Sequence, residues 1–203
     1  MKKIIYPVDS ITLNRNNLFG ANPDLYRQFG MNGHNGLDFS VVSKTPVKAV
    51  YDGEVIAVGY DEKGYGHHVR INHEGFQTIY AHGYESVGFE VGAKIKQGDI
   101  ILKSGNTGFS TGPHLHFGLR EIDAQGRVLK YDNGYYGYIN PLLWLDATEE
   151  LKIPKWSQEG VDWAIEHKII DSFESVMETV PPEAFKYTLA VMLQRYDQYR
   201  FNS

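Results

Sequence analysis

Short runs of alternating apolar and polar residues fill the middle of the chain, from about residue 37 to residue 120. Turn signals separate these runs, at Asp52-Gly53, Lys63-Gly64 and Glu74-Gly75. A period of two is the pattern of a strand that buries one face, and an Asp-Gly or similar pair between two such runs favours a hairpin. We therefore expect a mainly β domain here, built on an antiparallel sheet.

The pattern changes after Asp146. Apolar residues then recur every three or four positions, from Val161 to Ile169 and again from Phe185 to Tyr196, which is the period of an amphipathic helix. We expect two domains: residues 1–146, and a small C-terminal α-helical unit over residues 155–203.

The stretch GPHLHFGL, residues 112–119, places two histidines on one side of a predicted strand. Side chains alternate between the faces of a strand, so Leu115, Phe117 and Leu119 share the core while His114 and His116 face the other way. A run rich in Gly, Ser and Thr precedes the strand and reads as a loop, so both imidazoles lie at the rim of the sheet. A metal or a reacting group is expected beside them.

A second stretch, GHNGLDF, offers His34 and Asp38. Together with His116 they form a set of two imidazoles and one carboxylate, which suits zinc with the fourth position left for water. The chain has no cysteine, so a thiolate zinc site is excluded. An open zinc site lowers the pKa of its water to about 7, as peptide hydrolysis at neutral pH requires.

We expect two further histidines to lie beside this metal-binding set. His114 shares a strand face with His116. His82 ends another predicted strand, from which its ring could approach the metal-binding set from the opposite side. Peptide hydrolysis needs a base for the water proton and a group that stabilises the developing oxyanion. His67, His68 and His73 are expected to have surface or turn roles instead.

Composition and net charge limit the classes of partner that the chain is expected to bind. The formal net charge of −5 argues against nucleic acid, which binds basic surfaces. No stretch approaches the roughly 20 apolar residues of a membrane span. The first ten residues contain too few apolar side chains for the hydrophobic region of a signal peptide, so delivery by another route is expected.

The stretches HNGLD, YAH and GNTGFSTGPHLHF closely resemble the lysostaphin-type peptidoglycan metalloendopeptidases, over about residues 28–145. The resemblance implies one Zn²⁺ per chain with His34, Asp38 and His116 as its ligands, and His82 and His114 flanking the metal-bound water. It also implies an antiparallel sheet with a groove, and a peptide of the peptidoglycan stem or cross-bridge as substrate. A bacteriophage lysin or a virion-associated wall hydrolase is the natural context for such an enzyme.

Two other functions are compatible with parts of the pattern. A histidine phosphocarrier resembles the family in sheet architecture and uses paired histidines, but it has no need of an acidic ligand such as Asp38. A catalytically silent wall-binding module usually lacks a ligand or a flanking histidine, and none is missing here. The C-terminal unit distantly resembles S-layer homology motifs, so it is expected either to target the wall or to be structural.

Overall fold

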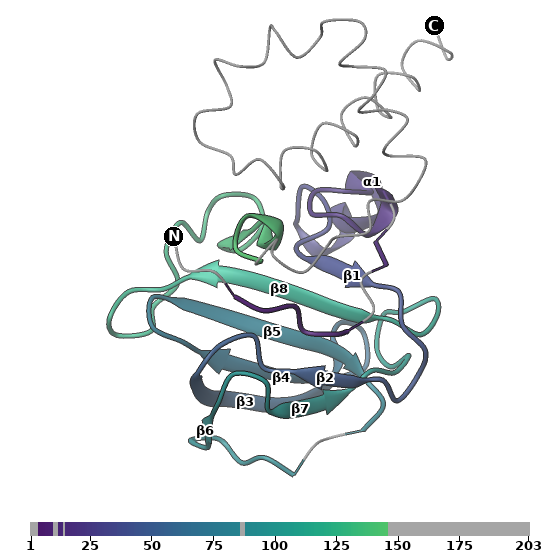
Figure 1. Ribbon diagram of the computed structural model, residues 1–203. Helices are drawn as coiled ribbons and strands as arrows, with labels where there is room; N and C mark the ends of the chain where they lie inside the picture. The colour runs from purple at the N-terminus through teal and green to yellow at the C-terminus, as the bar shows by residue number, and fades with distance from the viewer. Residues whose placement is uncertain (1–3, 10–11, 14, 86–87, 146–203) are drawn as a thin grey trace, which may run out of the picture. The chain divides into compact units, whose positions relative to one another are not determined.

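The computed structural model describes residues 4–9, 12–13, 15–85 and 88–145. Its main element is a seven-stranded sheet in the order β1-β8-β5-β4-β3-β6, with β9 also paired to β8, and β2 and β7 form a separate two-stranded sheet (Figure 1). Every strand pair is antiparallel. The mainly β, antiparallel fold predicted from the alternating pattern is confirmed.

The strands are β1 (Leu37–Phe39), β2 (Pro46–Lys48), β3 (Gly53–Asp61), β4 (Gly66–Asn72), β5 (Phe76–Gly83), β6 (Lys94–Ile95), β7 (Ile100–Lys103), β8 (Leu115–Glu121) and β9 (Tyr138–Ile139). The helical segments are short: η1 (Arg15–Asn17), α1 (Pro23–Tyr26), η2 (Arg27–Phe29) and η3 (Pro141–Leu143). Two of the predicted turns connect β3 to β4 and β4 to β5.

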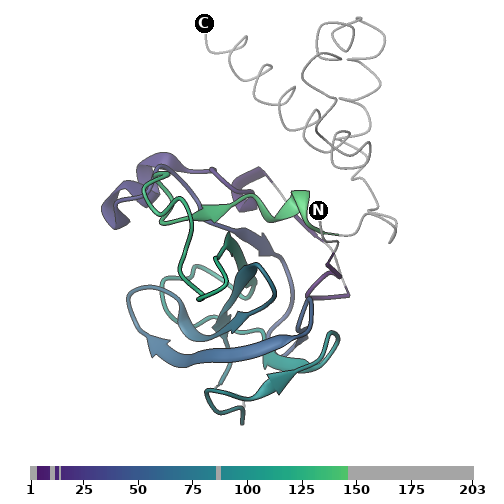
Figure 2. The ribbon, with the colours of Figure 1, turned by 90° about the vertical axis from the view of Figure 1, so that its left-hand side faces the viewer.

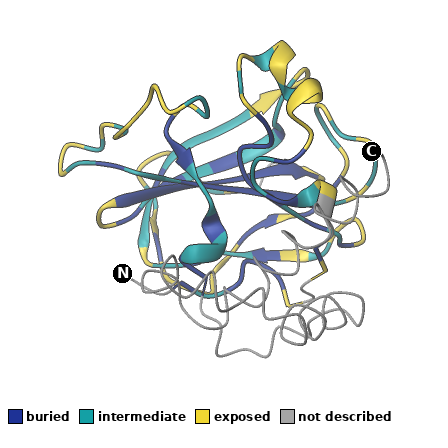
Figure 3. Cartoon of the chain, turned by 90° about the horizontal axis from the view of Figure 1, so that it is seen from above, coloured by how far each residue is buried: buried dark blue, intermediate teal, exposed yellow. Residues whose placement is uncertain are grey.

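One face of the large sheet forms the core. On β8 the alternation is as predicted: Leu115, Phe117 and Leu119 are fully buried. Phe117 packs against Tyr80 of β5, with the ring centroids 5.4 Å apart, and the Tyr80 hydroxyl accepts a hydrogen bond from Val50 N at 3.0 Å. The strand β7 contacts β4 and β5. Figure 3 shows that the buried residues are concentrated along strands in the middle of the domain.

The register of the central strands decides what meets on the opposite face. Asp38 of β1 and Ala81 of β5 are the neighbours of His116 on either side of β8. Two residues further along β8, Gly118 leaves room for the ring of Tyr138, which a Cβ there would approach to 2.7 Å. The strand pairing alone therefore places an acid beside a histidine at one end of this face.

The end of the described chain closes the β domain. Trp144 and Leu145 are buried, and Leu145 forms a parallel bridge with Ile4 near the N-terminus. The predicted helices of residues 155–203 lie outside the described residues, so this unit and its boundary stay predictions. Among the residues that are described, no helix has the length and apolar character needed to cross a membrane.

Candidate metal centre

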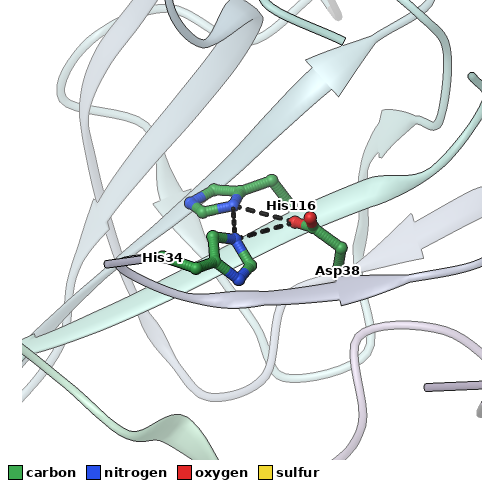
Figure 4. Close-up of side chains that lie close together, drawn as sticks. All are labelled: His34, Asp38 and His116. Atoms are coloured by element: carbon green, nitrogen blue, oxygen red, sulfur yellow. Dashed lines mark hydrogen bonds and ion pairs between the residues drawn. The ribbon is translucent and has the colours of Figure 1, made fainter. Parts of the chain in front are cut away.

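His34, Asp38 and His116 meet at the end of the β1–β8 pair (Figure 4). Asp38 and His116 are cross-strand partners, and His34 lies in the loop that leads into β1. Gly36 allows this loop to approach β8, because a Cβ at this position would lie 2.5 Å from Phe117 O and 2.7 Å from Cε1 of His116. Steric crowding therefore explains why HNGLD has a glycine at this position.

The three donor atoms form a nearly equilateral triangle. His34 Nε2 lies 2.9 Å from His116 Nδ1 and 3.1 Å from Asp38 Oδ1, and His116 Nδ1 lies 3.0 Å from the same carboxylate oxygen. Tetrahedral zinc at about 2.0–2.1 Å from each ligand sets its donors roughly 3.3 Å apart. The triangle is a few tenths of an ångström smaller, so the site accommodates zinc with a small adjustment.

The protonation pattern of the triangle also fits a cation. His34 Nδ1 lies 3.1 Å from the carbonyl oxygen of Leu18, which can only accept, so Nδ1 carries the proton and Nε2 presents its lone pair. In neutral His116 at most one proton is available to the two acceptor atoms that face Nδ1. The imidazoles of His34 and His116 are almost fully buried, so a metal ion would satisfy lone pairs that water does not reach.

The surroundings of Asp38 and His116 favour the protonation states in which these side chains bind a metal. Burial raises the pKa of the Asp38 carboxyl, but the neighbouring imidazoles of His34 and His116 outweigh it and hold that pKa well below the usual range. Burial lowers the pKa of His116, which keeps its ring neutral. A carboxylate and neutral imidazoles are the states that bind a metal.

His82 reaches the same site through an irregularity in β5. Ala81 is the residue opposite His116, so simple alternation would turn His82 to the core. A register shift in the β4–β5 pairing and a φ of 61° at His82 bring its ring to 5.9 Å from that of His116. Its Nδ1 donates to Thr107 O at 2.8 Å, and burial is the main cause that lowers its pKa to about 3. The neutral ring therefore has a bare Nε2.

His114 completes the group. Its ring centroid lies 4.6 Å from that of His82, and its Nε2 lies 3.7 Å from Asp38 Oδ1. Its Nδ1 lies 2.8 Å from Gly112 O, so in the neutral ring Nε2 is the bare nitrogen. All five residues singled out from the sequence are thus brought together.

Other histidines lie apart from this centre. Within the described part of the chain, His34, Asp38 and His116 are the one group of three side chains that could hold a metal ion. His73 occupies the β4–β5 turn, where it is 6% exposed and stacks on Phe76.

Two tyrosines near the metal centre were not singled out from the sequence. The ring of Tyr26 lies 5.3 Å from that of His34, and burial and the charge of Asp38 raise the pKa of its hydroxyl, which stays protonated. The ring of Tyr65 lies 5.6 Å from that of His116, and its hydroxyl accepts a hydrogen bond from Asn35 Nδ2 at 2.7 Å. Neither tyrosine lies in a distinctive sequence motif. The one signal for Tyr65 was its hydrogen-bond partner Asn35, which lies within HNGLD.

Comparison with known proteins places this arrangement in a family. An uncharacterized metalloprotease of Haemophilus influenzae is 44% identical over 97 residues, which cover 47% of this chain and 20% of that protein. Glycyl-glycine endopeptidase ALE-1 of Staphylococcus capitis is 37% identical over 91 residues, which cover 43% of this chain and 25% of that protein. The chain thus spans a quarter or less of the length of these two relatives.

The solved structures agree with the sequence relatives. The antimicrobial peptidase lysostaphin from Staphylococcus simulans matches with a TM-score of 0.53 and 25% identity, over 76% of this chain and 53% of that one. The model of peptidase family M23 matches residues 32–141, which include every residue of the candidate metal centre. The chain therefore belongs to peptidase family M23, a family of zinc-dependent metallopeptidases.

Proposed function

We propose that this chain is a zinc metalloendopeptidase that hydrolyses peptide bonds in the stem or cross-bridge of bacterial peptidoglycan. One observation carries the proposal: an open triangle of His34, Asp38 and His116 with two further imidazoles, of His82 and His114, directly beside it. A purely structural zinc site would have four protein ligands and would not need the flanking pair.

Each side chain has a distinct task in this proposal. His34, Asp38 and His116 hold the zinc ion, and the carbonyl of Leu18 fixes the ring of His34 through its Nδ1 proton. When bound, zinc supplies a Lewis acid that polarises the peptide carbonyl and activates water.

The flanking imidazoles move protons. The Nδ1 atoms of His82 and His114 are engaged with the carbonyl oxygens of Thr107 and Gly112, so both rings have a fixed orientation. A bare Nε2 accepts the proton that water loses on attack, and the resulting imidazolium donates it to the leaving amine. The second imidazole then donates to, or balances the charge of, the developing oxyanion.

Because the proposed substrate is peptidoglycan, we propose that the chain acts at the bacterial cell wall. The names of the relatives support this: ALE-1 is a glycyl-glycine endopeptidase, and lysostaphin an antimicrobial peptidase. A bacteriophage lysin or virion-associated enzyme remains the origin that we predict. The C-terminal unit of residues 155–203 is proposed to target the wall or to stabilise the β domain.

The proposal is tested by digestion of purified walls from several peptidoglycan types. Zinc-loaded protein should release new amino and carboxyl termini within the peptides, identified by mass spectrometry, and protein stripped of zinc should release none. Release of reducing sugar ends without new peptide termini, or equal release without zinc, would overturn it.

A further inference from the structure

A single threonine, Thr107, holds the flanking histidine His82 at two places. Thr107 lies in the loop between β7 and β8, and its carbonyl oxygen accepts a hydrogen bond from His82 Nδ1 at 2.8 Å. Its hydroxyl donates to the carbonyl oxygen of Gly83, the next residue of β5, at 2.7 Å. The same residue therefore contacts both the imidazole of His82 and the backbone that follows it.

The Thr107 hydroxyl also joins two strands. It accepts a hydrogen bond from His67 N at 3.0 Å, so it connects a main-chain donor of β4 to a main-chain acceptor of β5. His67 and Gly83 are partners in the β4–β5 pairing, next to its register shift. Main-chain groups that lose water on folding need hydrogen-bond partners, and the hydroxyl supplies them where the pairing is irregular.

His82 needs this support because its backbone is strained. Its φ of 61° lies in the left-handed region, which is unfavourable for a residue with a Cβ atom. Such a conformation persists only where the surroundings hold it. His82 N donates to Tyr65 O at 2.8 Å, and the bond from Thr107 to Gly83 O holds the other side of the residue. If the second bond were lost, the regular alternation of β5 would turn the His82 ring away from the metal centre.

The loop that carries Thr107 is itself fixed against the β3–β4 turn. Phe109 N donates to Gly64 O at 2.8 Å. At Gly66 a Cβ atom would overlap the Thr107 hydroxyl oxygen, so the close approach of the loop requires a glycine there. A loop that is fixed in this way can impose one orientation on the side chain that it contacts.

Thr107 is not among the residues that line the pocket beside the metal centre. This pocket has a volume of about 360 Å³. Its lining includes His82, His116 and aromatic side chains of the α1–η2 segment and of the loop before β9, two segments that Figure 2 shows side by side. Removal of the Thr107 hydroxyl should therefore alter the orientation of His82 without removing a contact to a group bound in the pocket.

We propose that Thr107 is a positioning residue for the peptidase reaction. Its hydroxyl holds the His82–Gly83 backbone in the conformation that turns the His82 imidazole towards the metal centre. Its carbonyl keeps the ring proton on Nδ1, so that Nε2 is free to accept a proton. The inference rests on the proposed peptidase function and adds to it a residue that neither binds the metal nor transfers a proton.

Steady-state kinetics on a soluble peptidoglycan peptide give the first test. Thr107→Val removes the hydroxyl and keeps the shape of the side chain, so kcat should fall about 10- to 100-fold. KM should stay within about twofold of the wild-type value, and the zinc content should not change. Thr107→Ser keeps a hydroxyl and should restore most of kcat. Thr45→Val is the matched control, because the Thr45 hydroxyl donates to Val42 O at 2.8 Å outside the pocket, and it should keep the wild-type kcat.

A double-mutant cycle tests whether Thr107 acts through His82. His82→Gln removes the imidazole, so adding Thr107→Val to that variant should reduce kcat by less than about twofold further. A further loss as large as the one that Thr107→Val causes in the wild type would mean that Thr107 acts on another group, and would overturn the proposal.

The state of the ring has a readout that does not depend on activity. Long-range proton–nitrogen NMR spectra of the zinc-loaded chain report which imidazole nitrogen carries the proton, and the His82→Gln variant identifies the His82 signals. The wild type and Thr107→Ser should have the proton on Nδ1 of His82, whereas Thr107→Val should show a mixture of tautomers. A proton on Nε2 in the wild type, or unchanged His82 signals in Thr107→Val, would overturn the proposal.

The outcomes separate the proposal from the function on which it rests. If the wild-type zinc-loaded chain cleaves no peptide, the peptidase function fails and the NMR spectra still test how His82 is held. Wild-type kcat in Thr107→Val, or an equal loss in Thr107→Ser, would overturn the role of the hydroxyl and leave the peptidase function intact. If Thr107→Val and Thr107→Ala both lose zinc or melt far below Thr45→Val, the residue is structural and the proposal fails.

Discussion

Replacing His73 by glutamine should flatten the dependence of the folding free energy on pH between about pH 6.5 and pH 4. The His73 ring is 6% exposed and stacks on Phe76, with centroids 4.4 Å apart. Its Nδ1 donates to Asp52 O at 2.9 Å, and its Nε2 accepts from the Thr78 hydroxyl at 2.8 Å. These contacts suit the neutral ring, and burial lowers the pKa from 6.5 to about 4.

The direction of the effect follows from proton uptake. The unfolded chain protonates His73 below about pH 6.5, whereas the folded chain does so only below about pH 4. Between these values the unfolded state binds more protons, so the stability contributed by the neutral ring falls as the pH falls. At about 1.4 kcal/mol per pH unit, the full loss of folding stability is about 3 kcal/mol. More than half of this loss has occurred once the pH has fallen to about 5.

The assay is urea unfolding of the wild type and His73→Gln at intervals from pH 8 to pH 4. Glutamine alters stability at every pH, so the quantity of interest is how the difference between the two proteins changes with pH. Acid release of zinc affects both proteins and cancels in this difference, since His73 is outside the metal-binding group. If this difference in unfolding free energy changes by less than about 0.5 kcal/mol over the pH range, the folded chain does not hold the pKa of His73 below its usual value.

Four further changes test the site and the domain organisation. His82→Gln and His114→Gln should keep one zinc per chain but lose roughly 10²- to 10⁴-fold in peptide cleavage; wild-type rates in both would contradict their proposed roles. Gly36→Ala should lower zinc affinity, measured by competition with a chelator, because its Cβ would displace the His116 ring; unchanged affinity would show that the contact is not needed. A chain ending at Asp146 should cleave soluble peptides and lose activity on intact walls; equal loss on both, with a lower melting temperature, would make the C-terminal unit structural.

Much of the sheet and of the metal centre was predictable because both depend on local periodicity and on motif spacing. The alternation in GPHLHFGL set Leu115 and Phe117 in the core and His116 on the other face, as the structure confirms. His82 shows the limit of this reasoning. Its orientation depends on a register shift and a positive φ, which no alternation rule contains.

The pocket beside the metal centre could not be predicted, because long-range contacts assemble its walls. Phe29 and Tyr136 are 107 positions apart and are joined by one hydrogen bond. The tyrosines of residues 131–138 differ in their surroundings. Tyr138 is buried against Gly118, whereas Tyr136 lines the pocket beside the metal centre.

We propose that one zinc ion, held by His34, Asp38 and His116, supports peptide hydrolysis. Its most direct test is to titrate zinc into metal-free protein while following both bound metal and cleavage of a soluble peptidoglycan peptide. Activity should rise in proportion to zinc and stop rising at one equivalent, and Asp38→Ala should bind zinc far more weakly and stay inactive. Full activity in the metal-free protein, or wild-type zinc affinity in Asp38→Ala, would contradict it.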